Sequence, residues 1–417
     1  MKKFLSFVLM AMFVFSLVCP MGTFTYAAET QVSLEDTPID VVYCYADLWD
    51  HTLRRGELDN SIIKDYDNKE LRYSLRSVLK NIPWVRKIFI IMPNDKVRFL
   101  KDPEEIGDRI VYVKNEDLLG FDTNSPHVKQ FTMWKLKEKF GCSNHIIYMD
   151  DDCFIGKPLK KSDFFYVDNN KVVPYVFGNP KTATTNLRKV APYLDEHKKM
   201  FSWSLKDCER RQREIKDIER GGHPEANNGG AYQNLSTYIF LMKDVFKKDQ
   251  IELPGRAGMF HCAYPVKLDE LKELYDYVDK SKYAKPSLYE KRRSTLALMV
   301  SPTYAYYTLT KYSRKVKFPQ INHISLNKCL EADFDVELFV INEEARNYLT
   351  YADSDYRNAR NTMKRLFPEP THYEIPNLKL DIFDFDEGVP GKTNQKMSPS
   401  NKTSTARYKS KFYLKRK

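Results

Sequence analysis

The chain has 417 residues, enough to bury one large α/β core or two smaller ones, and its composition is that of a globular protein. Its formal net charge of +11 invites a nucleic-acid partner, but residues 392–417 alone carry nine Lys or Arg and no acid. Once Lys2 and Lys3 are also set aside, residues 28–391 are neutral. Composition therefore excludes a basic nucleic-acid-binding fold, and we expect residues 386–417 to form a disordered basic tail that can contact an anionic surface.

The first 27 residues predict a signal peptide. Lys2 and Lys3 precede an apolar run over 4–18, and small residues end the segment at Ala27 and Ala28. The run is short for a membrane span of about 20 residues, which favours cleavage over a retained signal anchor. No later segment is long and apolar enough to cross a bilayer. We therefore expect an extracytoplasmic or secreted protein.

Six cysteines remain after the signal, and none of them forms a CxxC pair. Their spacings do not match a zinc motif. In an oxidising compartment one or more disulfides are possible, but the sequence does not specify the pairing.

Residues 38–166 alternate between strand and helix patterns. A helix is expected from Asp67, where Asp67 and Glu70 fit a capping box, and a second one over about 127–140. This alternation predicts an α/β fold with a mostly parallel sheet flanked by helices. The strand-like runs are 39–45, 85–92, 109–113 and 145–149.

The later part of the chain suggests an insertion in one domain. Residues 181–260 contain a charged helical stretch and a glycine-rich loop, which is either a lid or an exposed linker. Order is expected to return at 261, with a Tyr-rich segment at 303–312 and a helix over about 353–367. We expect 38–180 and 261–385 to be two halves of one α/β domain.

Acidic residues follow two of the expected strands. Asp47 and Asp50 come after the first strand, and the run Asp150, Asp151 and Asp152 comes after the fourth. In open parallel sheets, ligands bind beyond the carboxyl ends of the strands. The acid run either holds a hard divalent cation or caps the strand. Three successive acids repel one another, and that cost suggests a compensating cation.

Basic residues and one histidine offer further chemistry. Arg72 and Arg76 lie four apart on one helix face and either clamp a phosphate or form a helix-face ion pair with Glu70, which spacing alone favours. His261, between apolar residues, is either a core residue or a base. The basic cluster that ends at Arg293 is either surface or catalytic.

Read in order, these segments resemble the Stealth family, which includes bacterial capsular polysaccharide phosphotransferases and the catalytic subunit of the lysosomal-enzyme N-acetylglucosamine-1-phosphotransferase. The resemblance is specific in a second block, looser elsewhere, and spans about 38–375. The blocks that carry it are IDVVYCYADLWD (39–50), DNKELRYSLRSVLKNIPWVRKIFII (67–91), TNSPHV (123–128), IIYMDDDCFIGKPLKKSDFF (146–165), His261 with Tyr264 and Pro265, Arg293, and FPEPTHYE (367–374).

Three positions depart from the family pattern. Lys129 stands where a glutamate is usual, and residues 296–298 read Leu-Ala-Leu where an acid is expected. The block that usually contains Ile-Asn-Asp is read here as residues 326–328, with a lysine at the acid position.

The resemblance implies a glycosyltransferase-A-like nucleotide-sugar site in a catalytic domain interrupted by a helical insertion. It implies transfer of hexose-1-phosphate or N-acetylhexosamine-1-phosphate, as from UDP-GlcNAc, from a UDP-sugar donor to the hydroxyl of a glycan or glycoprotein acceptor, with release of UMP. The implied residues are His261, Arg293, Arg72 and Glu70 in catalysis, Asp47, Asp50, Asn124, Ser125 and Arg76 in substrate binding, and Asp151 and Asp152 as ligands of Mg²⁺ or Mn²⁺.

Such an enzyme needs a nucleotide-sugar donor, which favours a secretory-pathway lumen such as the Golgi. Two other interpretations stay open. A metal-dependent glycosyltransferase would use the same acid turn and release UDP. A secreted carbohydrate-binding protein descended from an enzyme would bind sugar without turnover.

Overall fold

A computed structural model describes part of the chain, and the statements below concern that part. The expected signal peptide, most of the 181–260 insertion and the basic tail lie outside it, as do the candidate site residues Asp47, Asp50, Asn124 and Arg293. The domain boundaries therefore stay predictions. The described residues are 32–45, 70–93, 96–123, 125–178, 204–206, 209–210, 236–249, 261–290, 298–342, 353–376 and 378.

The main sheet has five strands in the order β3-β2-β1-β4-β9. The first four are mutually parallel, and only β9 runs antiparallel, against β4. The predicted α/β fold with a mostly parallel sheet is confirmed. The strands are β1 (Ile39–Cys44), β2 (Ile88–Met92), β3 (Ile110–Lys114), β4 (His145–Met149) and β9 (Tyr264–Lys267).

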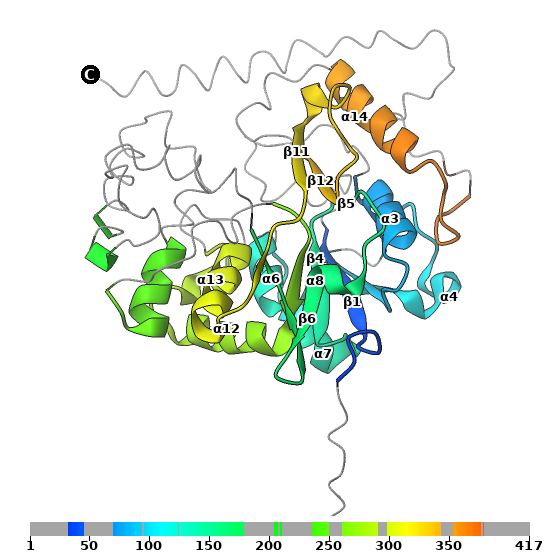
Figure 1. Cartoon of the computed structure of the whole chain (residues 1–417). Coiled ribbons are helices and arrows are strands. Elements are labelled where there is room, and N and C mark those ends of the chain that lie inside the picture. The colour runs from blue at the N-terminus through cyan, green and yellow to red at the C-terminus, as the bar shows by residue number, and fades with distance from the viewer. Residues whose placement is uncertain are drawn as a thin grey trace, which may run out of the picture.

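Both faces of the main sheet are covered, which explains why its strands are continuously apolar. Along β4, Ile146 and Tyr148 join one core cluster with α12 and α13, whereas Ile147 and Met149 join another with α3. Figure 1 shows α12 and α13 on one side of the sheet and α3 on the other. The long helices are α3 (Glu70–Asn81), α12 (Leu268–Lys280), α13 (Val300–Tyr312) and α14 (Asp353–Leu366).

A second sheet, in the order β11-β12-β5, begins directly after the acid run. Gly156, which follows β5, donates its N–H to Glu337 C=O at 2.9 Å, and a Cβ there would lie 2.2 Å from Val336 O. Only glycine allows this close backbone approach. The remaining strands are β5 (Cys153–Ile155), β6 (Phe165–Asp168), β7 (Lys171–Pro174), β8 (Val176–Phe177), β10 (Val316–Lys317), β11 (Ile321–Ser325) and β12 (Leu338–Asn342).

The expected helix over 127–140 forms as two short helices instead of one. Thr132 at the end of the first donates its hydroxyl to the carbonyls of Val128 and Lys129 at 2.8 and 3.0 Å, and the chain turns at Met133. Hydroxyl bonding to a preceding carbonyl tends to bend a helix. The short helices are α4 (Pro103–Ile106), α5 (Asn115–Leu119), α6 (Pro126–Thr132), α7 (Lys135–Phe140) and α8 (Lys161–Phe164).

The strand order sets where a ligand can bind. From β1 the chain builds outward through β2 and β3, and it then returns to place β4 on the other side of β1. The connections therefore diverge between β1 and β4, and the carboxyl ends of these two strands form the crevice where open α/β sheets bind ligands. The turn Asp150–Asp152 lies at this crevice, because it joins β4 to β5.

Two other sequence expectations concern membranes and cysteines. In the described ranges, no helix has the length and apolar character needed to span a bilayer. Cys44, Cys142, Cys153, Cys262 and Cys329 are free thiols. The possible disulfides are therefore absent among these five, and Cys208 lies outside the described residues.

Asp40 on β1 is fully buried and ties the strand to two neighbouring segments. Its Oδ1 accepts from Arg86 Nε at 2.9 Å and from Lys87 N–H at 3.0 Å. Its Oδ2 accepts from Arg86 Nη2 at 2.6 Å and from Ser143 N–H at 2.6 Å. Both carboxylate oxygens are thus needed as acceptors.

We expect Asp40→Asn to destabilise the fold by about 1–3 kcal/mol, because either amide orientation sets the new NH₂ against a backbone N–H. The free energy of unfolding from urea titration tests this. Asp335→Asn, which alters an exposed ion pair with Lys157, is the control and should change stability by less than about 0.5 kcal/mol. Equal effects of the two substitutions would contradict the assignment.

Candidate active site

The candidate site is built on the turn that follows β4. The N–H of Cys153 donates to Asp150 C=O at 3.1 Å, which closes the turn. Every β4 residue after His145 is buried, so the acids are the first side chains able to leave the core at this edge. Sequence reasoning placed the turn correctly, at the carboxyl end of a strand.

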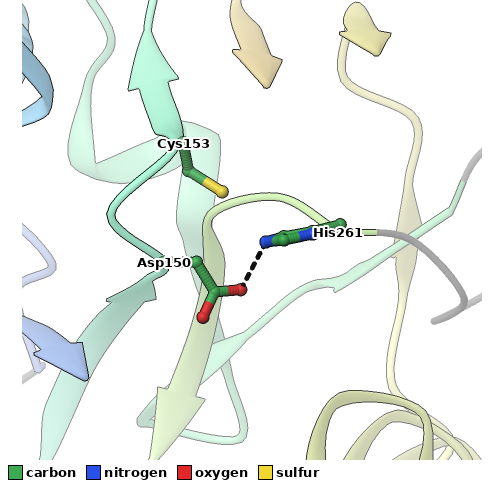
Figure 2. A group of neighbouring side chains, drawn as sticks. All are labelled: Asp150, Cys153 and His261. Carbon is green, nitrogen blue, oxygen red and sulfur yellow. Dashed lines mark ion pairs between the residues drawn. The ribbon is translucent and has the colours of Figure 1, made fainter. Parts of the chain in front are cut away.

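His261 lies against two of the three acids. Its Nε2 is 2.8 Å from Asp150 Oδ2 and 3.0 Å from Asp152 Oδ1 (Figure 2 draws the contact with Asp150). The antiparallel register pairs Tyr148 with Tyr264, and continuing it by three residues in each strand brings position 261 beside the acid turn. His261 is therefore held in the site by the pairing of β9 with β4.

The contact changes the protonation of both partners. Burial alone would lower the pKa of His261, but the carboxylates of Asp152 and Asp150 outweigh it and raise the pKa well above the ordinary value. Burial alone would raise the pKa of Asp150, but the charge of His261 and its hydrogen bonding lower it. At neutral pH the site therefore holds an imidazolium between carboxylates.

Tyr148 and Gln130 fix the orientation of the Asp150 carboxylate. The hydroxyl of Tyr148 donates to Asp150 Oδ1, and Gln130 Nε2 donates to the Tyr148 hydroxyl at 2.6 Å. One oxygen of Asp150 is thus fixed by the protein, and the other faces His261. This network was not expected from the sequence, because Gln130 and Tyr148 are 18 residues apart.

Cys153 adds a sulfur to the same group. One ligand atom from each of Asp150, Cys153 and His261 lies within 4.8 Å of the other two (Figure 2). Burial raises the pKa of the Cys153 thiol to about 12, so it is a thiol at neutral pH. The sequence prediction did not include Cys153, because its partner His261 lies on a distant segment.

Asp151 faces a different cation. It lies within electrostatic range of Lys129, a buried residue of α6 whose Nζ is 3.5 Å from Tyr45 C=O. Burial lowers the pKa of Lys129, while Cys44, Asp122 and Asp151 act to raise it. The repulsion within the acid run is thus offset by His261 on one side and Lys129 on the other.

His323 is a further residue that the sequence analysis missed. In the second sheet His323 pairs with Val340, which pairs with Cys153, so all three side chains project from one face. The pKa of His323 is lowered by burial and by the charge of His261, while Asp152 opposes this. The ring also keeps a solvent-exposed surface, where screening weakens these interactions. The β11 sequence carries no motif that singles out this histidine.

The two arginines of α3 converge on Glu374. Arg76 Nε and Nη2 bond its two carboxylate oxygens at 2.7 Å each, and Arg72 Nε bonds Oε2 at 2.6 Å. Arg76 Nη1 also donates to Phe367 C=O at 2.8 Å. The expected ion pair therefore forms with a residue far along the chain, and phosphate binding by either arginine stays a prediction.

Ser125 and Glu70, two other predicted site residues, are buried. Ser125 precedes α6, and its N–H donates to Thr123 Oγ1 at 3.0 Å. Glu70 begins the described part of α3 and is buried. Nothing in these contacts tests the substrate or catalytic roles expected for them.

The fold and the site define the class of this molecule: an α/β protein whose acid and histidine side chains meet at the switch point of a mostly parallel sheet. Residues 64–173 match the Stealth protein conserved region 2. This region contains α3, β4 and the acid turn. The resemblance predicted from the sequence is thereby confirmed, and the chain carries this Stealth region.

Curated relatives match part of the chain. The chain is 30% identical over 170 residues to a capsular polysaccharide phosphotransferase of Neisseria meningitidis serogroup B, covering 37% of this chain and 44% of that protein. It is 32% identical over 152 residues to capsular polysaccharide phosphotransferase fcs1 of Haemophilus influenzae, covering 33% and 40%. The chain thus spans less than half the length of these relatives.

Among solved structures, the chain is similar to the galactosyltransferase LgtC in complex with donor and acceptor sugar analogs. The TM-score is 0.33 at 10% sequence identity, and the match covers 78% of this chain and 95% of that one. A likeness this distant carries no argument about function.

We expect Glu374→Gln to destabilise the protein by about 3–5 kcal/mol, because it leaves the buried charge of Arg76 without its counter-ion. Urea unfolding at pH 7 tests this. Asp276→Asn, which alters an exposed helix-surface pair with Lys272, is the control and should cost less than about 0.5 kcal/mol. A small effect of Glu374→Gln would show that the buried pair contributes little.

The same pair predicts a pH dependence. Burial alone would raise the pKa of Glu374, but hydrogen bonds from Arg76, Thr371 N–H and Arg72 lower it overall. The stabilisation is therefore fully present above the ordinary pKa of 4.5 and is lost as the pH falls through the lower folded value. The difference in unfolding free energy between the parent and Glu374→Gln should be constant from pH 7 to 5 and shrink below that range. A difference that grows in acid would contradict this sign.

Proposed function

We propose that this protein is a sugar-1-phosphate transferase. It moves hexose-1-phosphate or N-acetylhexosamine-1-phosphate from a UDP-sugar to a hydroxyl of an acceptor glycan. The donor's diphosphate bond breaks, a new phosphodiester forms on the acceptor oxygen, the acceptor proton leaves to a base, and UMP is released.

One observation carries this proposal: His261 and the acid turn meet at the switch point between β1 and β4. A nucleotide ligand has its expected place at this edge. The matched relatives are named capsular polysaccharide phosphotransferases, and the Stealth region that the chain carries contains the acid turn.

His261 would accept the proton of the acceptor hydroxyl as a neutral imidazole, after the proton that it shares with Asp150 and Asp152 has left. A base must reach the proton it removes and must be oriented, and the carboxylates of Asp150 and Asp152 orient the imidazole through Nε2. His323 on β11 lies within electrostatic range of His261 and Asp152 and would bring a second imidazole to the same cluster.

A hard divalent cation fits the oxygen donors of the turn. Asp151 and Asp152 are successive carboxylates at the crevice, and oxygen ligands of this kind suit Mg²⁺ or Mn²⁺. When bound, such a cation neutralises diphosphate charge. Lys129 lies within electrostatic range of Asp151 at the same edge.

The remaining site residues belong to this proposal as sequence expectations. Arg293 and Arg72 would neutralise phosphate charge, and Glu70 would hold Arg72 or a sugar hydroxyl. Substrate contacts are proposed for Asp47, Asp50, Asn124, Ser125 and Arg76. Because the reaction needs a nucleotide-sugar donor, we expect it to take place in a secretory lumen such as the Golgi or in another extracytoplasmic space. The expected acceptor is a glycan or a glycoprotein.

Product analysis tests the reaction. The full chain is incubated with a panel of UDP-sugars, Mn²⁺ or Mg²⁺, and simple glycoside acceptors, and the nucleotide products are measured by mass spectrometry. We expect UMP together with a sugar-phosphate diester. Release of UDP would instead indicate a metal-dependent glycosyltransferase, and donor binding without turnover would indicate a carbohydrate-binding protein.

We expect His261→Gln to lower kcat by about 10²–10⁴-fold, the usual contribution of a positioned base. Thermal unfolding confirms that the variant is folded; its midpoint should fall, because Asp150 and Asp152 lose their shared cation. His372→Gln, an exposed histidine outside the cluster, is the control and should keep parent activity. Full activity of His261→Gln would remove the histidine from the mechanism.

The cation assignment has its own test. We expect the double variant Asp151→Asn with Asp152→Asn to lose turnover by at least about 10²-fold at saturating Mn²⁺, because both proposed ligands lose their charge. Normal turnover of this variant would show that the cation, if required, binds elsewhere.

A further inference from the structure

Four aromatic side chains form a row at the surface beside α12, outside the site described above. The rings of Trp134 and Tyr275 have centroids 5.4 Å apart, and those of Tyr289 and Phe121 have centroids 6.4 Å apart. A side-chain hydrogen bond between Tyr275 and Tyr289 joins the two pairs. Tyr289 is 52% exposed, and the other three are partly exposed. We call these four residues the aromatic strip, and apolar surface gathered in this way is typical of a binding surface.

One face of α12 supplies both an aromatic ring and polar groups to the strip. Lys272, Tyr275, Asp276 and Asp279 lie at positions i, i+3, i+4 and i+7 of the helix, so their side chains project from the same side. Lys272 Nζ lies 3.3 Å from Asp276 Oδ2. The helix thus places an ion pair next to an aromatic ring.

The lysines that lie over two of the rings carry their own counter-ions. Lys272 Nζ is 5.0 Å from the ring centroid of Trp134, and Lys285 Nζ is 5.9 Å from that of Tyr289. Lys285 pairs with Asp279 Oδ1 at 3.0 Å, and the Tyr289 hydroxyl donates to the same oxygen at 3.3 Å. The strip therefore offers aromatic faces flanked by hydrogen-bonding groups whose charges cancel in pairs.

This combination favours a neutral, hydroxyl-rich partner. Paired lysines and acids give little attraction to a nucleic acid or an anionic membrane. A second protein surface would have to desolvate the exposed ion pairs, which costs free energy. Sugar hydroxyls can instead bond the carboxylates and ammonium groups while the apolar C–H face of the pyranose covers an aromatic ring. A row of several rings suits a chain of sugars better than a single sugar.

One end of the strip adjoins the loop that leads into α6. Glu290, the residue after Tyr289, accepts at its C=O from the Thr123 hydroxyl. Thr123 Oγ1 also accepts from the N–H of Ser125, which directly precedes α6. Phe121 belongs to this same loop. Because Gln130 of α6 reaches the acid turn through Tyr148, the strip and the site described above share one structural element.

We propose that the aromatic strip binds a chain of neutral pyranose sugars. Sugar rings stack on the exposed faces of Tyr289 and its neighbours, and their hydroxyls bond Asp279 and the paired lysines. In a sugar-1-phosphate transferase this chain would be the part of the acceptor glycan that lies outside the crevice, and this last assignment rests on the proposed function.

Binding experiments on the full chain test the strip without an activity assay. The probes are maltohexaose, cellohexaose, mannohexaose and chitohexaose, each compared with its monosaccharide by saturation-transfer NMR and calorimetric titration. We expect at least one hexasaccharide to bind more tightly than its monosaccharide, because a chain contacts more than one ring. Tyr289→Ala should weaken that binding by about 3–10-fold, the range that one aromatic contact supplies.

Matched variants separate the strip from exposed aromatic surface in general. Phe318, just after β10, is 51% exposed and lies outside the strip, so Phe318→Ala should bind the hexasaccharide as the parent does. Tyr289→Phe keeps the ring and loses only the hydroxyl, so it should retain most of the affinity. Thermal unfolding of each variant confirms that it is folded.

Three results would overturn the strip as a glycan site. The first is a folded parent protein that binds none of the four hexasaccharides. The second is an equal affinity of Tyr289→Ala and the parent, or an equal loss in Tyr289→Ala and Phe318→Ala. The third comes from sedimentation velocity: a parent dimer that Tyr289→Ala converts to a monomer would assign the strip to a contact between two copies of the chain.

Acceptor kinetics distinguish the strip from the transferase proposal. Where transfer is observed, we expect Tyr289→Ala to raise KM for a hexasaccharide acceptor more than KM for a monosaccharide glycoside, because only the longer acceptor reaches the strip. Equal rises would contradict a role of the strip in acceptor binding. Hexasaccharide binding that depends on Tyr289, without turnover of any UDP-sugar, would support the strip and contradict the transferase proposal.

Discussion

The candidate site depends on the pairing of β9 with β4. Backbone hydrogen bonds in this antiparallel pair set a register in which Tyr264 lies beside Tyr148. That register carries His261 to the acid turn, more than 100 residues earlier in the chain. Without it, three successive carboxylates would lie at the edge of a parallel sheet without this compensating imidazole. The one antiparallel strand of the main sheet is therefore the element that completes the site.

Charge compensation then gives each acid of the turn a separate environment. Asp150 and Asp152 share the imidazole of His261, while Asp151 lies within electrostatic range of Lys129. The repulsion that the sequence suggested would require a bound cation is thus met largely by protein cations. The proposed Mg²⁺ or Mn²⁺ would use the oxygens of Asp151 and Asp152 at this edge of the sheet.

Residues near the end of the described chain stabilise α3 and the second sheet. Glu374 holds Arg76 and Arg72, and α14 packs on the core cluster that contains Phe154 and Phe339 of the second sheet. Figure 1 shows α14 above α3 and beside the second sheet. The fold thus ties residues 353–376 to the helix that begins the second Stealth-like block. The two arginines are first of all part of this support.

Local pattern determined the elements and their order. Apolar runs and alternation were sufficient to predict a mostly parallel α/β sheet and the acid turn after β4, and the resemblance of the sequence blocks predicted the family that residues 64–173 match. The split of the 127–140 helix was missed, because it depends on a single hydroxyl bonding back to carbonyls. Which side chains meet was decided only by tertiary structure. Cys153 with His261, Lys129 with Asp151, and Arg76 with Glu374 are brought together by sheet register and helix packing, which act between segments far apart in sequence and leave no spacing that a motif could record.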